Sequence, residues 1–141
     1  MTNGERADRL IGEARQIAGE MKRALDDEAW NLATRRAQEV LELAIKALLN
    51  EMSLDYPKTH DPAPVFAHAV RTRGIDVDAG VLDTLTALSQ ELAKVRSPAF
   101  YQETLVSEAL ARDWVQRVEL PDGSWYWDLK PDWRPGEVVD L

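Results

Sequence analysis

Apolar residues recur at intervals of three and four along most of the chain, a spacing that predicts amphipathic helices. One stripe runs through residues 5–25 and a second through residues 29–48. Either Asp26 or Asp27 is expected to cap the second helix. That second stripe is rich in alanine, and small side chains let neighbouring helices approach closely. We therefore expect the second helix to occupy the centre of the fold.

Helix boundaries are also marked further along the chain. Asp61 followed by Pro62 is typical of an N-cap with proline in the first helical position. A short helix over residues 63–73 should follow, and Gly74 is placed to end it. These signals predict a short connection between the central helix and the next one.

Two further helices complete the predicted bundle. One begins near Asp78, and the sequence Arg-Ser-Pro at 96–98 should end it, because a residue before proline avoids helical geometry. The last helix resumes near Thr104 or Ser107. Short connections favour antiparallel neighbours. The expected fold is all-α: an up-and-down bundle of about five helices over residues 1–118.

The C-terminal tail, residues 119–141, has a different pattern. A turn is predicted at 120–124, and the next five residues alternate between apolar and polar with period two. A β-hairpin or an extended arm on the bundle is therefore expected. One alternative is that the tryptophans of the tail fix it to its own bundle, and the other is that they form an interface with a partner or a second copy. These tryptophans are Trp125, Trp127 and Trp133.

Composition excludes several kinds of chemistry. The 141 residues include no cysteine, which rules out disulfides, thiol catalysis and thiolate metal sites. With two histidines and no suitable carboxylate spacing, we predict neither a metal site nor any other cofactor. The formal net charge is −8, so nonspecific binding of nucleic acid is not expected, although a local basic patch can still bind a phosphate.

The location of the protein is predicted from the absence of a secretory signal and of a membrane-spanning segment in the sequence. The first residues lead directly into a charged helix without the apolar region of a secretory signal. No segment approaches the roughly 18–20 apolar residues that a membrane span requires. We therefore expect a soluble cytoplasmic protein that does not associate with membranes.

Four features carry a family resemblance, and the first is the amphipathic helix over residues 5–25 that precedes the central helix. The central helix contains AQEVLELAIKALL, in which Glu42 and Lys46 lie one turn apart and form an ordinary i, i+4 pair. The segment YPKTHD follows it, and ELAKVRSPAFYQE precedes the last helix, SEALARDWVQRV. In this order, over residues 5–118, the segments resemble the HEPN family of small helical-bundle proteins. The tail looks like an addition to the core of that family.

The resemblance implies a bundle that usually dimerises. Many family members are encoded beside a minimal nucleotidyltransferase and act as its toxin or binding partner. Active members are metal-independent ribonucleases with an Arg-x4–6-His motif near the last helices, completed across the dimer. Neither His60 nor His68 follows an arginine at that spacing, and the residue four intervening positions after Arg96 is Tyr101. A tyrosine, with a reference pKa of about 10, is a poor general base at neutral pH, so we assign no catalytic residue.

The turn after the central helix contains the candidate binding residues. In one interpretation Lys58, His60 and Arg96 surround an anionic group such as a nucleotide phosphate, with Tyr101 stacking or hydrogen bonding beside it. In the other, His60 is structural and caps a helix end or bonds a backbone carbonyl. The sequence leaves both interpretations open.

Three functional hypotheses follow from these observations. The preferred one is a non-catalytic binding module that self-associates and docks a nucleotidyltransferase or a nucleotide. The second is a toxin-like ribonuclease with a non-standard site. The third is a structural bundle without a ligand.

Overall fold

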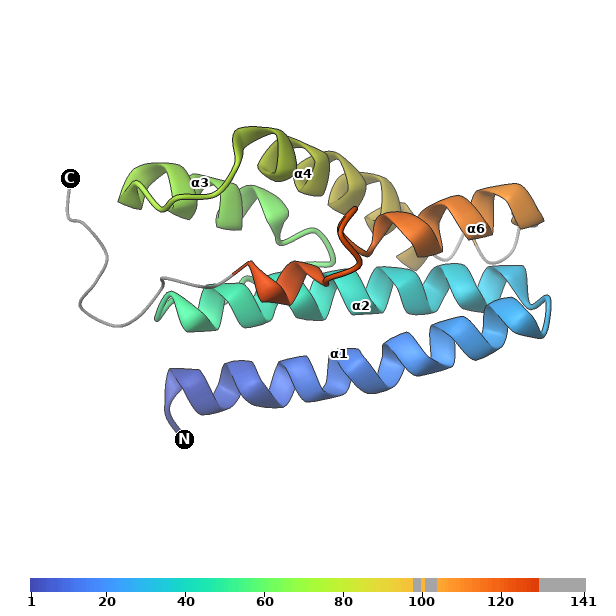
Figure 1. The fold of residues 1–141 in the computed structure, drawn as a ribbon, viewed down its shortest axis with the longest axis horizontal. Helices are drawn as coiled ribbons and strands as arrows, with labels where there is room; N and C mark the ends of the chain where they lie inside the picture. The colour runs from blue at the N-terminus through green and yellow to red at the C-terminus, as the bar shows by residue number, and fades with distance from the viewer. Residues whose placement is uncertain (98–99, 101–103, 130–141) are drawn as a thin grey trace.

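The computed structural model describes residues 1–97, 100 and 104–129 (Figure 1). In this part of the chain, all regular structure is helical apart from one isolated β-bridge. The prediction of an all-α bundle is confirmed. The α-helices are α1 (Asn3–Asp26), α2 (Trp30–Glu51), α3 (Ala63–Arg73), α4 (Ala79–Ala93) and α6 (Glu108–Arg117), and the 3-10 helices are η1 (Lys94–Arg96) and η2 (Tyr126–Asp128).

Helix α2 is the centre of the molecule, as its alanine content predicts. It forms a long antiparallel hairpin with α1, and α3, α4 and α6 pack on its other side (Figure 1). Four of its alanines are at most 1% exposed: Ala33, Ala37, Ala44 and Ala47. None of the helices in the described residues is both long and apolar enough to cross a membrane.

Three of the predicted helix boundaries are confirmed. Asp78 caps α4 by accepting a hydrogen bond from the Val81 amide, at 3.0 Å. Ser107 caps α6 in the same way, accepting from the Leu110 amide at 3.1 Å. Gly74 ends α3 in a left-handed conformation with φ of 60°, which glycine adopts without strain.

The predicted cap of α2 is wrong. Neither Asp26 nor Asp27 caps this helix, because its N-cap position falls at Ala29, which makes no side-chain cap. The reason is the tight turn between α1 and α2. Glu28 takes a left-handed backbone conformation, and the Ala29 amide bonds back to the Ala24 carbonyl, so α1 extends through Asp26.

Asp61 does not cap α3 either. Its carboxylate oxygen Oδ1 accepts a hydrogen bond from the Ser89 hydroxyl at 2.6 Å, and Ser89 lies on α4. The Asp61 amide donates to the Thr59 hydroxyl at 3.1 Å. This aspartate therefore joins two helices instead of ending one, a role that local sequence signals cannot reveal.

The predicted hairpin in the tail is only partly formed. The turn over 120–124 closes with a 2.8 Å hydrogen bond from the Leu120 amide to the Ser124 carbonyl, and Glu119 pairs with Trp125 in one antiparallel bridge. The chain then turns into η2 instead of continuing as a strand, because the Asp128 carboxylate accepts from the Trp125 amide at 2.9 Å. Trp133 and the rest of 130–141 lie outside the described residues.

The two described tryptophans of the tail pack within their own chain. Their rings stack, with centroids 4.9 Å apart and planes 8° apart. Lys22 lies 5.3 Å from the Trp125 ring centroid and Arg15 lies 5.9 Å from that of Trp127, both from α1. Trp127 is 1% exposed. The pair therefore attaches residues 119–129 to the bundle, and the interface role of Trp125, Trp127 and Trp133 stays a prediction.

Candidate functional site

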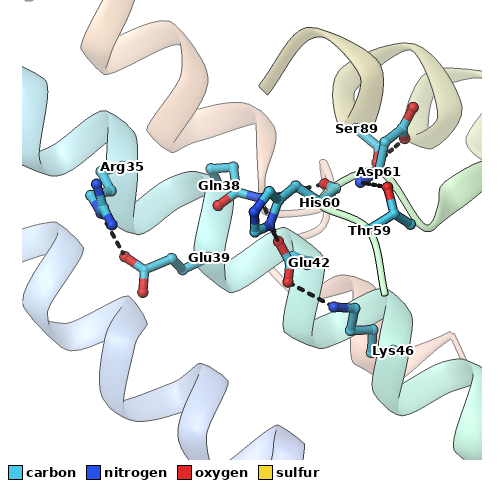
Figure 2. A network of polar contacts seen from close by, with 9 residues as sticks. All are labelled: Arg35, Gln38, Glu39, Glu42, Lys46, Thr59, His60, Asp61 and Ser89. Carbon is cyan, nitrogen blue, oxygen red and sulfur yellow. Dashed lines mark hydrogen bonds and ion pairs between the residues drawn. The ribbon is translucent and has the colours of Figure 1, made fainter. Parts of the chain in front are cut away.

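One face of α2 carries a polar residue at every fourth position. These residues are Gln38, Glu42, Lys46 and Asn50, and we call them the polar ridge. Residues four apart lie above one another on a helix, so the ridge runs along a single side of α2. Figure 2 shows its first three members beside His60, which reaches the ridge from the loop between α2 and α3.

Glu42 is the centre of a closed network. Its Oε1 accepts a hydrogen bond from Gln38 Nε2 at 2.8 Å and lies 2.8 Å from His60 Nδ1 (Figure 2). Its Oε2 accepts from Lys46 Nζ, also at 2.8 Å. An ionised carboxylate can only accept, so Nδ1 of the ring is the donor. Three donors thus occupy both oxygens of one carboxylate, and we call these four residues the Glu42 network.

The network holds Glu42 in its charged form. Burial opposes ionisation and alone would raise the pKa, but hydrogen bonds from Lys46, Gln38 and His60 outweigh it and hold the pKa of Glu42 below its usual value. The Glu42 and Lys46 side chains are only 15% and 13% exposed. At neutral pH this is a largely buried ion pair with an imidazole attached.

The same contacts fix the loop that carries the sequence signature. Gln38 Nε2 lies 3.4 Å from the His60 carbonyl oxygen, in addition to its bond with Glu42. On the other side of His60, Asp61 reaches Ser89 on α4. The segment THD is therefore tied to α2 and to α4 at once (Figure 2). His60 binds a side-chain carboxylate, which neither of the sequence-based interpretations names.

The described residues predicted to bind an anion come from two elements, Lys58 and His60 from the α2–α3 loop and Arg96 from η1. Lys58 is exposed on the loop and Arg96 is half-buried at the end of η1. Within the described part of the chain, no hydrogen bond or ion pair joins either of them to His60. Tyr101 lies outside the described residues. A phosphate site formed by these four residues stays a prediction.

Sequence reasoning missed the two ends of the polar ridge. Gln38 and Asn50 are 1% and 2% exposed. Each has one buried polar atom without a hydrogen-bond partner in the described residues, Oε1 of Gln38 and Nδ2 of Asn50. The sequence signal that points to them is the spacing of four between polar positions on an alanine-rich helix, with Glu42 and Lys46 between the two amides.

The described residues hold no group of three or more histidine, aspartate or glutamate side chains arranged to bind a metal ion. What the Glu42 network offers is an imidazole oriented by a carboxylate. The His60 side chain is 51% exposed. A ring held through Nδ1 keeps its second nitrogen, Nε2, available for other partners.

Comparison with protein families gives a match to the model described as the HEPN domain, over residues 7–120. The chain belongs to the HEPN family. The match extends from α1 beyond the end of α6 and includes the whole polar ridge and the YPKTHD loop. Neither the curated proteins nor the solved structures give a significant match. In this HEPN domain, the signature histidine and the Glu-x3-Lys pair of α2 belong to one hydrogen-bonded network.

Proposed function

We propose that this HEPN domain is a non-catalytic interaction module that self-associates and docks a protein partner, with a minimal nucleotidyltransferase as the first candidate. The observation that carries this proposal is the Glu42 network. Lys46, His60 and Gln38 are all directed at one carboxylate, so the polar residues of the signature stabilise the scaffold. No arginine precedes either histidine at the spacing of the ribonuclease motif.

Exposed leucines at one end of the molecule support self-association. Leu32 is 45% exposed at the start of α2, Leu110 is 37% exposed at the start of α6, and Leu105 just before α6 is 94% exposed. Figure 1 places the starts of α2 and α6 at the same end of the bundle. We call these three residues the leucine surface. Exposed apolar residues gathered in one region are typical of interaction sites.

Leu105 is held in its exposed position by Asn31. The side-chain nitrogen of Asn31 donates to the Thr104 carbonyl at 3.0 Å, and its side-chain oxygen accepts from the backbone amide of Val106 at 2.8 Å. The backbone on both sides of Leu105 is thus fixed to the start of α2. An exposed leucine on an anchored backbone costs little conformational entropy when it enters an interface.

The oligomeric state tests self-association. We expect a dimer at micromolar concentration by light scattering, and we expect Leu105→Glu to convert it to a monomer, because a charge would be buried in the interface. Val65→Glu is the matched control, since Val65 is 42% exposed on α3, away from the leucine surface. A monomeric wild-type protein, or equal effects of the two variants, would overturn the proposal.

The partner is tested by co-expression with a nucleotidyltransferase encoded in an adjacent reading frame. A stoichiometric complex that survives gel filtration is expected, and separate elution of the two proteins contradicts the partner. A nucleotide at Lys58, His60 and Arg96 has weaker support. The Glu42 carboxylate lies 2.8 Å from the His60 ring and repels an anion there.

A second candidate function, a ribonuclease with a non-standard site, is favoured by one observation. The half-exposed His60 ring is oriented by a carboxylate, which is how many general bases are positioned. This hypothesis expects purified protein to cleave RNA, and expects His60→Gln to abolish cleavage. RNA that stays intact during long incubation rejects it.

A further inference from the structure

A cleft of about 380 Å³ lies where the first turns of α1 meet the last turn of α2. Arg6, Arg9 and Glu13 line it from α1, Asn50 from α2, and Tyr56 from the following loop. It lies at the opposite end of the α1–α2 hairpin from the leucine surface (Figure 1). Lys58, His60 and Arg96 are not among its lining residues.

Asn50 gives the cleft a buried hydrogen-bond donor. Its side chain is 2% exposed, and its amide nitrogen has no partner in the described residues. A buried donor without an acceptor is unfavourable, and folded proteins rarely retain one without a reason. Asn50 also lines the cleft, but its Nδ2 has almost no exposed surface, so an acceptor bound there can satisfy it only after the side chain turns toward the cleft.

Positive charge predominates in the lining of the cleft. Among the described residues that line it, two guanidinium groups, those of Arg6 and Arg9, stand against one carboxylate, that of Glu13. The Arg9–Glu13 ion pair is loose, at 3.7 Å with both side chains largely exposed, so Arg9 can turn toward a ligand. In a chain with net charge −8, such a surface favours an anion locally. Guanidinium groups match the oxygens of a phosphate as a fork.

The ends of the two helices are compatible with an anion. The start of α1 contributes the positive end of its dipole, which the Glu5 carboxylate of the capping box offsets in part. The opposing end of α2 is partly neutralised, because Arg73 donates to the Met52 carbonyl at 2.6 Å. Tyr56, 40% exposed, adds an aromatic surface for an apolar or ring-shaped group.

We propose that the cleft binds a small phosphate-bearing molecule, with the phosphate held by Arg6, Arg9 and the Asn50 amide and its organic group against Tyr56. This site goes beyond the proposed interaction function and does not depend on it. A free phosphate ion and a phosphate monoester share the recognised chemistry. Only the monoester has an organic group that can contact Tyr56.

The first test is titration of the full chain with inorganic phosphate and with phenyl phosphate, followed by NMR. Both should bind saturably, phenyl phosphate more tightly, and phenol should not bind. The side-chain NH₂ signals of Asn50, identified by their loss in Asn50→Leu, should shift during the titration. Equal affinity for the two anions would assign the site to phosphate ion alone and overturn the role of Tyr56. Unchanged Asn50 signals would overturn the site.

Charge variants separate the cleft from nonspecific attraction. Arg6→Gln/Arg9→Gln should weaken binding of phenyl phosphate about tenfold, because both forked contacts are lost. Arg23→Gln/Arg71→Gln is the matched control: it removes the same charge at exposed positions outside the cleft. Equal losses in the two double variants would overturn the proposal.

Asn50→Leu provides a variant whose fold is retained, because it removes an unsatisfied donor and keeps a similar volume. We expect it to reduce phenyl phosphate affinity about fivefold while the circular dichroism spectrum stays unchanged. Unchanged affinity in this variant would overturn the contact with Asn50. Light scattering on the same samples measures the oligomeric state, so a change in phosphate affinity can be told apart from a change in self-association.

Discussion

The middle and the end of the polar ridge both bury polar side chains, and they differ in how those side chains are hydrogen bonded. Glu42 and Lys46, in the middle, are largely buried, and each is hydrogen bonded at 2.8 Å. Asn50, one turn further, is even more buried, and its amide nitrogen has no hydrogen-bond partner among the described residues. The difference lies in what the following loop supplies, since His60 reaches Glu42 whereas Tyr56 lines a cleft beside Asn50. A buried polar residue stabilises the scaffold where the fold supplies its partner, and at Asn50 we propose that a ligand supplies the partner instead.

The largest change in stability is expected for the substitution of Glu42, in the middle of the polar ridge. Glu42→Ala leaves the Lys46 ammonium largely buried without a counter-charge and frees His60 from α2. We expect a loss of about 2–3 kcal/mol in the free energy of unfolding, measured by urea denaturation. A loss below about 0.5 kcal/mol would mean that the network contributes as little as a surface ion pair.

Asn50→Leu should act in the opposite direction. Replacing an unpaired buried amide with an apolar side chain of similar size removes a desolvation penalty and should stabilise the protein by about 1 kcal/mol. Thermal unfolding in buffer without phosphate measures this. Destabilisation by a similar amount would show that the amide has a partner, and the contrast with Glu42 would then fail.

The pH dependence of stability distinguishes the two positions further. The pKa of Glu42 is lower in the folded than in the unfolded protein, so its contribution is present above the unfolded value of about 4.3. It is lost as the pH falls through the lower folded value. The difference in free energy of unfolding between wild type and Glu42→Gln should therefore shrink as the pH falls from about 6 to about 3. The difference for Asn50→Leu should stay constant, because an amide does not titrate.

The smallest effect is expected for His60→Gln. The histidine is half exposed, and a glutamine amide can still donate to Glu42. Denaturation should show a change within about 0.5 kcal/mol. A loss comparable to that of Glu42→Ala would make His60, and not the Glu42–Lys46 pair, the main contact of the network.

Local signals predicted the fold well. Periodicity located the helices, and Asp78, Ser107 and Gly74 act at helix ends as expected, because capping depends on a few neighbouring atoms. The predicted caps at Asp26 and Asp61 were wrong because contacts beyond the neighbouring residues determine the surroundings of both side chains. A backbone turn and a hydroxyl on a distant helix determined their environment.

The candidate site was much harder to predict than the fold. Glu42 and His60 are 18 residues apart, and their contact depends on how the loop packs across α2. One interpretation of the sequence placed His60 with Lys58 and Arg96 around an anion and the other made it structural, and neither named Glu42 as its partner. That the Asn50 amide nitrogen has no partner among the described residues is a property of the folded interior, and no pattern of residue types shows it.

The contacts between the tail and α1 have a consequence for folding during synthesis. Lys22 pairs with Glu119 at 2.9 Å, and Arg15 lies against Trp127, so one side of the first helix is covered by residues about a hundred positions later. The α1–α2 hairpin can form early, because its partners are adjacent in sequence. Its outer side stays open to water until residue 127 leaves the ribosome. During that interval the side of α1 around Arg15 and Lys22 lacks the aromatic cover that Trp125 and Trp127 provide in the folded chain.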